Sequence, residues 1–310
     1  MQQRKSCIGI IGLGWVGSSV AISTLRSGVA RELLLHDTRT AVAEGEAMDL
    51  AHGASFYPAA SVRAAGLDEL HQADAIVIAA GRNSTADQSR LDLLRENAGL
   101  ARELGRAFSN YRGVVVVVTN PVDVLTHVFQ KASGLAPERV IGTGTMLDTT
   151  RLRQHLGREL GLDPRSIHAQ VIGEHGDSEV VLWSSARVGG TPLRAWAGWN
   201  AERETRVAKD VRTAAYEIIR RKGATNHAIG LVTASLLQSI LQDERRVLTV
   251  SRVQSGTSGA TDVAFSLPAV VGAEGASQVI HPELDAAERE GLQRSVATLA
   301  QAIASASEAG

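Results

Sequence analysis

The chain has 310 residues, enough for one large domain or two domains with a substantial hydrophobic core. It carries 32 Lys and Arg against 33 Asp and Glu, so its formal net charge is −1 and no basic field indicates binding to nucleic acid or an anionic membrane. Hydrophobic residues make up 44% and charged residues 21%, which is typical of a globular protein and excludes a disordered one.

The single cysteine, Cys7, excludes an internal disulfide and a cysteine-rich zinc site. Two basic residues, Arg4 and Lys5, precede a short apolar run as in a signal peptide, but this run leads directly into a glycine-rich turn. No apolar stretch approaches the roughly 18 residues that span a bilayer. We therefore expect a soluble cytoplasmic protein with a small-molecule partner and no bound metal.

The first half of the chain alternates short β-rich apolar runs with longer segments of helical periodicity. The runs predict strands at Ile8–Ile11, Leu33–Leu35, Ile76–Ala80 and Val114–Val118. The periodic segments predict helices at Val16–Ser27, Ala41–His52, Leu91–Asn110 and Val122–Ala132. Strands that are apolar on both faces are typical of a parallel sheet covered by helices, so the pattern predicts a doubly wound α/β nucleotide-binding domain.

The pattern changes past residue 143, and we predict a domain at 1–143 followed by a mixed α+β domain at 144–310 that binds substrate. Helices are predicted at Leu147–Leu160, Glu202–Arg221, His227–Gln242 and Glu283–Ser305. Strands are predicted at Ile167–Ile172, Glu179–Trp183, Val247–Val253 and Val263–Leu267.

A glycine-rich turn, Gly12-x-Gly14-x-x-Gly17, follows the first predicted strand and opens a predicted helix. This spacing suits a tight turn, a close approach to a pyrophosphate and close helix–strand packing, with the phosphates at the helix N-terminus. Asp37 ends the second strand, where a carboxylate accepts hydrogen bonds from ribose hydroxyls and repels a 2′-phosphate. The sequence therefore predicts NAD rather than NADP, against the alternative of an ordinary glycine turn with a chance aspartate.

Candidate acid–base residues gather in the second half. His175 lies on a glycine-flanked corner, Gly173-Glu-His-Gly-Asp177, and an imidazole exchanges protons near neutral pH. Asp148 is a candidate to fix its tautomer, and Arg151 shares a helix face with Asp148 and is a candidate clamp for a carboxylate. Thr119 and Asn120 follow the five-valine strand, at the sheet edge where α/β proteins bind ligands.

These motifs make the chain resemble the NAD-dependent L-lactate/malate dehydrogenase family over nearly its full length. The resemblance rests on residues 12–17 (GLGWVG), 44–50 (EGEAMDL), 119–123 (TNPVD), 144–151 (GTMLDTTR) and 173–177 (GEHGD). It implies a Rossmann-type sheet, NAD as cofactor, a small 2-oxo or 2-hydroxy acid as substrate, and a homodimer or homotetramer. Candidate interface helices are Val16–Ser27 and Glu202–Arg221.

The resemblance also assigns roles. His175 is the proton donor and acceptor, Asp148 orients it, Arg90 polarises the carbonyl, and Arg151 pairs with the substrate carboxylate. Asn120 and Thr225 line the substrate site, and the cofactor site comprises Gly12, Gly14, Val16, Gly17, Asp37, Gly81, Thr119 and Asn120. Because the imidazole must be protonated to receive an oxo acid, oxo-acid reduction is expected to weaken as pH rises through its pKa.

The loop before Arg90 departs from the family. Lactate enzymes usually have Gln and malate enzymes Arg six residues before the loop arginine, whereas this chain has Ser84. A short uncharged side chain leaves room for a larger neutral substrate and offers no cation to a dicarboxylate. Two alternatives stay open: Arg82 supplies the missing cation for malate, or Ser84 faces solvent.

Arg153 and His168 match positions at which allosteric bacterial lactate dehydrogenases bind fructose 1,6-bisphosphate, although an ordinary interface or surface pair is favoured for a match of two residues. Malate dehydrogenase is the main alternative function, and an NAD-binding regulatory protein is another. A related fold supports NAD- and metal-dependent glycoside hydrolysis, but the position of Cys7 within the first strand does not suit its metal site.

Overall fold

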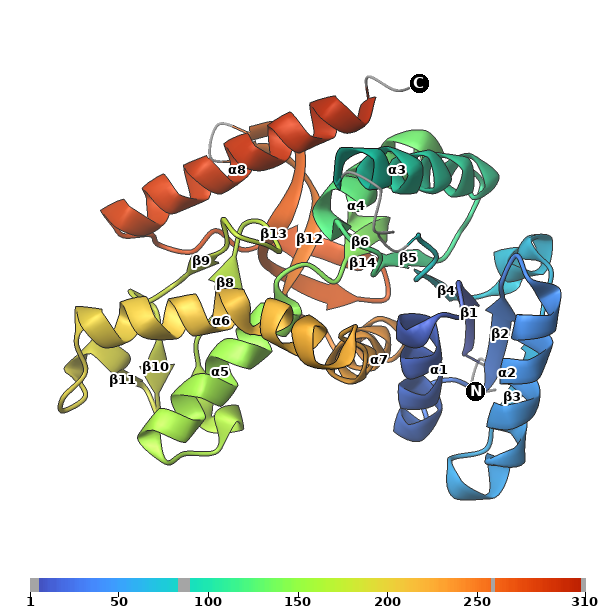
Figure 1. Cartoon of the computed structure of the whole chain (residues 1–310), viewed down its shortest axis with the longest axis horizontal. Helices are drawn as coiled ribbons and strands as arrows, with labels where there is room; N and C mark the ends of the chain where they lie inside the picture. The colour runs from blue at the N-terminus through green and yellow to red at the C-terminus, as the bar shows by residue number, and fades with distance from the viewer. Residues whose placement is uncertain (1–5, 83–89, 258–259, 308–310) are drawn as a thin grey trace.

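The computed structural model describes residues 6–82, 90–257 and 260–307. Figure 1 shows a central sheet with helices on both faces and a smaller group of elements around α5 and α6. The first half contains β1 (Cys7–Ile11), α1 (Trp15–Ser27), β2 (Glu32–His36), α2 (Thr40–His52), β3 (Ser61–Ala64), β4 (Ala75–Ile78), α3 (Arg90–Ala107), β5 (Val114–Val117), α4 (Val122–Ser133) and β6 (Val140–Gly142).

The second half contains four helices and eight strands among the described residues. They are α5 (Met146–Leu160), β7 (Ile167–His168), β8 (Val171–Ile172), β9 (Val180–Val181), β10 (Arg187–Val188), β11 (Thr191–Pro192), α6 (Ala201–Lys222), α7 (His227–Leu241), β12 (Arg246–Thr257), β13 (Ala260–Gly272), β14 (Gly275–Val279) and α8 (Ala286–Ser307).

The main sheet has nine strands in the order β14-β13-β12-β6-β5-β4-β1-β2-β3. The six strands from β6 to β3 are parallel, and β12, β13 and β14 continue the sheet in antiparallel pairing. Residues 144–310 therefore do not build a sheet entirely of their own. The predicted fold class, a doubly wound parallel sheet followed by mixed α and β elements, is confirmed.

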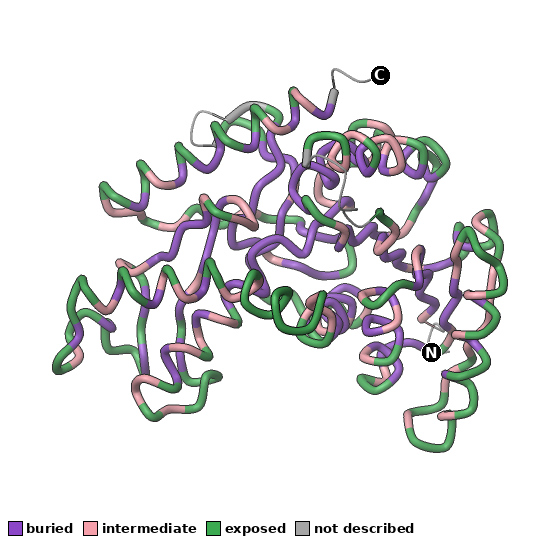
Figure 2. Tube along the Cα trace, in the orientation of Figure 1, coloured by how far each residue is buried: buried purple, intermediate pink, exposed green. Residues whose placement is uncertain are grey.

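Both faces of this sheet are buried, and the side chains of β5 illustrate why. Val115 and Val117 pack into a core with α3, α4 and α8, whereas Val114 and Val116 pack into a second core with α1, α2 and α7. Figure 2 shows the strands as the buried interior between these two helical layers. A strand covered on both faces has a continuous apolar sequence, and for this reason the sequence pattern predicted β5 correctly.

Some predictions of single elements were wrong. Residues 167–172 form two strands, β7 and β8, which belong to different small sheets, and only Val180–Val181 of the run 179–183 is a strand. The strands β3 and β6 were not predicted, because β3 is only partly buried and β6 has three residues. Within the described ranges, no helix is long and apolar enough to cross a membrane.

Candidate active site

The glycine-rich turn between β1 and α1 is built by close backbone contacts. Gly12 has φ +92°, and a Cβ there would lie 2.4 Å from the backbone of Ala80. A Cβ at Gly17 would lie 1.9 Å from the carbonyl oxygen of Gly12, so neither position accepts a side chain. Gly14, by contrast, faces open space at the N-terminus of α1, in whose first turn Val16 lies. This arrangement fits a pyrophosphate held by backbone N–H groups.

Asp37 lies directly after β2 and beside this turn. Its carboxylate accepts hydrogen bonds from the backbone N–H of Leu13 and of Arg39, both at 3.0 Å. Burial alone would raise the pKa of Asp37, but these N–H groups and the Arg39 guanidinium outweigh it and hold the pKa below its usual value. A negative charge therefore lies beside the glycine-rich turn, which suits a ribose hydroxyl and disfavours a 2′-phosphate.

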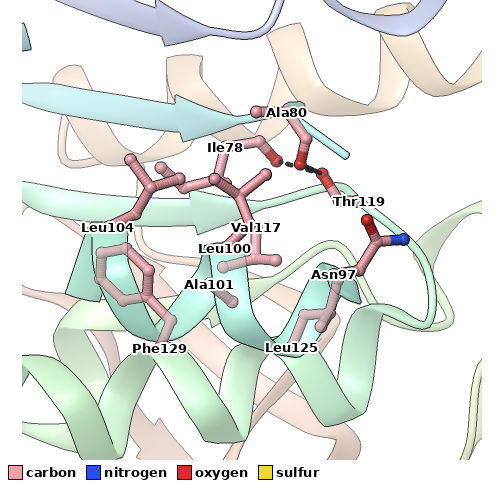
Figure 3. Close-up of a pocket in the computed structure, with 10 residues that line it drawn as sticks. All are labelled: Ile78, Ala80, Asn97, Leu100, Ala101, Leu104, Val117, Thr119, Leu125 and Phe129. Atoms are coloured by element: carbon pink, nitrogen blue, oxygen red, sulfur yellow. Dashed lines mark hydrogen bonds between the residues drawn. The ribbon is translucent and has the colours of Figure 1, made fainter. Parts of the chain in front are cut away.

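The ends of β4 and β5 bring Gly81, Thr119 and Asn120 together. Thr119 Oγ1 donates to the carbonyl oxygens of Ala80 at 2.8 Å and Ile78 at 3.2 Å (Figure 3). A Cβ at Gly81 would lie 2.3 Å from Cγ2 of Thr119, so glycine is required by this contact. The cavity behind these residues is only about 10 Å³, too small for a ligand, and so belongs to the packing of the sheet edge.

Asn97 of α3 ties these two strand ends together and was missed by sequence reasoning. Its Oδ1 accepts from the backbone N–H of Arg82 at 2.8 Å, and its Nδ2 donates to the carbonyl oxygens of Arg82 at 3.3 Å and Asn120 at 3.5 Å. An asparagine within a helix carries no local signal for such a contact, because its partners lie on other elements.

His175, Asp148 and Arg151 form one hydrogen-bonded group. Nδ1 of His175 lies 2.5 Å from Oδ2 of Asp148, and Nη1 of Arg151 donates to Oδ1 of the same carboxylate at 2.9 Å. The Asp148 side chain is 3% exposed, Arg151 13% and His175 21%, so the group opens to solvent through the histidine and the arginine. With Nδ1 bound to Asp148, Nε2 is the nitrogen that can exchange a proton with a ligand.

Threonine side chains at the start of α5 hold Asp148 in this position. Thr145 Oγ1 donates to the carbonyl oxygen of Val171 at 2.6 Å, and Thr149 Oγ1 accepts from the backbone N–H of Val171 at 3.0 Å. Both bonds join α5 to β8, the strand that leads into the His175 corner. The helix and the corner are therefore fixed to each other on both sides of Asp148.

The carboxylate of Asp148 controls the protonation of His175. Burial alone would lower the pKa of His175, but the adjacent Asp148 charge and hydrogen bond outweigh it and raise the pKa to about 9. Burial would raise the pKa of Asp148, whereas His175 and Arg151 hold it below its usual value. The group therefore holds one carboxylate and two cations near neutral pH, a net charge of +1 that suits a monocarboxylate ligand.

The backbone of the corner is fixed by α4 and α8. The N–H of His175 donates to Asp123 Oδ2 at 2.8 Å, and the N–H of Glu174 donates to Ser295 Oγ at 2.7 Å. A Cβ at Gly173, which has φ +85°, would lie 2.7 Å from Ser295 Oγ, so glycine permits this approach. Asp123 and Ser295 were not predicted as site residues, although Asp123 lies within the quoted motif at 119–123.

The remaining predicted residues fall into two groups. Thr225 is half-buried two residues before α7, whereas Ser84 lies outside the described residues, as does the side chain of Arg90, the first residue of α3. Arg153 donates through Nε to the carbonyl oxygen of Ala169 at 3.0 Å and lines a cavity of about 280 Å³ that His168 does not line. An allosteric role for that pair stays a prediction.

The described residues contain no group of three or more His, Cys, Asp or Glu side chains arranged to hold a metal ion. A doubly wound sheet with a glycine-rich turn that fits a pyrophosphate, together with a histidine–aspartate–arginine group, is typical of a nucleotide-dependent enzyme class with acid–base chemistry.

Comparison with known proteins gives the family. Residues 6–142 match the NAD binding domain of lactate/malate dehydrogenases, and residues 145–309 match their alpha/beta C-terminal domain. An L-lactate dehydrogenase of Salinibacter ruber and L-lactate dehydrogenase 2 of Enterococcus faecalis are each 44% identical over 306 residues, covering 96% of both chains. The crystal structure of the minor L-lactate dehydrogenase from Enterococcus mundtii is similar with a TM-score of 0.94 at 38% identity, covering 97% of this chain and 98% of that one.

The chain therefore belongs to the lactate/malate dehydrogenase family of NAD-dependent oxidoreductases that act on CH–OH groups. This confirms the resemblance and the prediction of NAD as cofactor. The glycine turn and Asp37 would hold its pyrophosphate and ribose, respectively.

Proposed function

We propose that this chain is an NAD-dependent L-2-hydroxyacid dehydrogenase of the L-lactate dehydrogenase type. It reversibly reduces pyruvate or a larger neutral 2-oxo acid, with His175 as proton donor and acceptor. The observation that carries the proposal is the hydrogen-bonded group of His175, Asp148 and Arg151, with its net positive charge. The L-lactate dehydrogenases that match at 41–44% identity support the substrate class.

In this mechanism Arg151 binds the substrate carboxylate. One nitrogen of its guanidinium is bound to Asp148, and its remaining N–H donors are available for two parallel hydrogen bonds to a carboxylate. When NADH is bound, the carbonyl carbon would receive its hydride. His175 gives its Nε2 proton to the carbonyl oxygen as negative charge develops there, and Arg90 polarises the same oxygen. Asn120 and Thr225 complete the substrate site, and Asp148 stabilises the imidazolium before transfer.

The pH dependence of both directions follows from the raised pKa of His175. The protonated form that an oxo acid requires is fully populated well below pH 9 and is lost as pH rises through about 9. We expect kcat/KM for oxo-acid reduction to be flat near neutral pH and to fall about tenfold per pH unit above that midpoint, since one proton is lost. Oxidation of the hydroxy acid should rise over the same range.

Steady-state kinetics between pH 6 and 10.5 in both directions test this expectation. Asp148→Asn removes the charge that raises the pKa, so its midpoint should lie lower than that of the wild type. A reduction profile that stays flat through pH 10.5 would contradict the role of His175.

The choice of a neutral substrate rests on the loop before α3. Ser84 is uncharged, and Arg82, the alternative cation for a dicarboxylate, pairs instead with Glu96 at 3.3 Å on an exposed surface. This contact favours a lactate-type enzyme over a malate dehydrogenase. An NAD-binding regulatory protein is disfavoured because a sensor has no use for a proton donor paired with an anion-binding arginine.

A panel of 2-oxo acids tests the proposed pocket. We expect kcat/KM to be higher for pyruvate, 2-oxobutyrate, 2-oxoisocaproate or phenylpyruvate than for oxaloacetate, because the loop sequence 83–89 contains no cation for a second carboxylate and Arg82 pairs with Glu96. Ser84→Gln should shift the preference from the larger oxo acids towards pyruvate by filling the added volume. If oxaloacetate is the best substrate of the wild type, the neutral-pocket proposal is wrong.

We further propose a cytoplasmic homo-oligomer. The two helices predicted to form the subunit interface both expose large apolar side chains. These are Trp15 and Ile22 on α1 and Tyr216 and Ile219 on α6. Large exposed apolar groups on one protein are typical of interaction surfaces.

A further inference from the structure

Asp123 contacts the backbone of the His175 corner, and its place at the start of a helix does not account for this contact. It lies in the first turn of α4, where a carboxylate favours the helix N-terminus whatever else it touches. Its Oδ2, however, accepts the backbone N–H of His175 at 2.8 Å, from a residue 52 positions away in the sequence. The residue is 2% exposed, so its charge is held away from solvent.

We propose that Asp123 is a positioning residue for proton transfer: its carboxylate fixes the backbone of His175, and its charge, added to that of Asp148, stabilises the protonated imidazole. This inference rests on the proposed function of His175. A backbone N–H needs only a neutral acceptor, so a buried carboxylate in this place carries an extra desolvation cost. That cost is explained if the charge serves the neighbouring imidazolium.

The electrostatics of the corner support this role. Burial raises the pKa of Asp123 to about 6, even though the nearby Ser251 hydroxyl and the His175 N–H oppose the rise, so the carboxyl is ionised at and above neutral pH. Its charge in turn favours protonated His175, after the larger contribution of Asp148. Asp123 therefore acts on His175 from α4 while Asp148 acts from α5.

The other charged groups around His175 do not replace Asp123. Arg151 of α5 opposes protonation of the imidazole. Burial and the charge of Asp148 raise the pKa of Glu179, next to β9, which disfavours its ionised form. Glu174 in the corner disfavours the charge of Asp123. Asp148 and Asp123 are the two carboxylates that contribute most to raising the pKa of His175.

Two substitutions separate the charge from the hydrogen bond. Asp123→Asn keeps an acceptor oxygen and removes the charge, so the pH midpoint of pyruvate reduction should fall by about one unit while the plateau kcat stays within about threefold. Asp123→Ala removes both, so the same fall should accompany a loss of plateau kcat of about 10- to 100-fold from misplacement of His175. The measurements are kcat and kcat/KM between pH 6 and 10.5, with Tm recorded for each variant.

Glu288 of α8 provides a matched control. It is also buried and accepts the backbone N–H of Ser184 at 2.8 Å, but it does not contact His175. Glu288→Gln should therefore lower Tm without moving the pH midpoint. If Asp123→Asn also keeps the wild-type pH midpoint, whether or not its Tm falls, the proposal is overturned.

Asp123→Glu keeps the inference testable if the neutral variants fold poorly. It retains the charge but displaces the acceptor, so its midpoint should stay within about half a unit of wild type while its plateau kcat falls. A midpoint lowered by a full unit in Asp123→Glu would contradict the role of the charge. Failure of the proposed function itself is distinguishable, because the wild type would then show no midpoint for reduction at all.

Discussion

His175→Ala is expected to lower kcat for pyruvate reduction by about 10²–10⁴-fold, the usual contribution of a positioned acid–base group. Nε2 of His175 is the proposed proton donor, and a methyl group leaves the developing alkoxide without a proton. The variant also removes one of the two cationic partners of Asp148, whose side chain is 3% exposed. Arg151 is then the remaining cation of the group that pairs with this carboxylate. The pH profile of its residual activity should no longer show a midpoint near pH 9.

NADH binding separates this loss from unfolding. The glycine turn and Asp37 lie on other elements, so the affinity of His175→Ala for NADH, followed by fluorescence, should stay near wild type. His155→Ala is the matched control, since His155 is a partly buried histidine on α5 whose charged neighbours are Arg158, Asp210 and Glu159. A His175→Ala enzyme that keeps more than a tenth of wild-type kcat would remove the histidine from the mechanism.

Arg151→Gln is expected to lower kcat/KM for pyruvate by about 10³-fold, since breaking a buried charge pair costs about 3–5 kcal/mol and each 1.4 kcal/mol is a factor of ten. Glutamine cannot form two parallel charge-assisted hydrogen bonds to a carboxylate. Arg151 also opposes protonation of His175, so its removal should move the pH midpoint upwards. The opposite movements in Arg151→Gln and Asp148→Asn would show that both groups act on one imidazole.

An uncharged substrate analogue tests the assignment of Arg151 to the carboxylate. Pyruvamide lacks the charge that the guanidinium binds, so wild type should use it poorly and Arg151→Gln should lose far less activity towards it than towards pyruvate. Arg158→Gln, an exposed arginine on the same helix, should behave as wild type with both. Equal losses on pyruvate and pyruvamide would indicate that Arg151 acts on the fold of the site and not on the carboxylate.

The sequence alone determined the features that depend on local patterns. Strands buried on both faces read as apolar runs, so the four strands predicted in the first half of the chain were found. The glycine turn was found because Gly12 and Gly17 are required by backbone contacts that only glycine permits. The spacing of Asp148 and Arg151 along one helix likewise predicted a shared face, and the two side chains do contact each other.

Contacts between residues far apart in the sequence became visible only in the folded chain. The extension of the parallel sheet by β12, β13 and β14 was not predicted, because strand pairing depends on the path of the whole chain and not on the composition of each strand. The same holds for the contact of Asp123 with the backbone of His175 and for Asn97, whose side chain joins the ends of β4 and β5. Local propensity does not encode such long-range contacts, since their partners are brought together only by packing around the sheet.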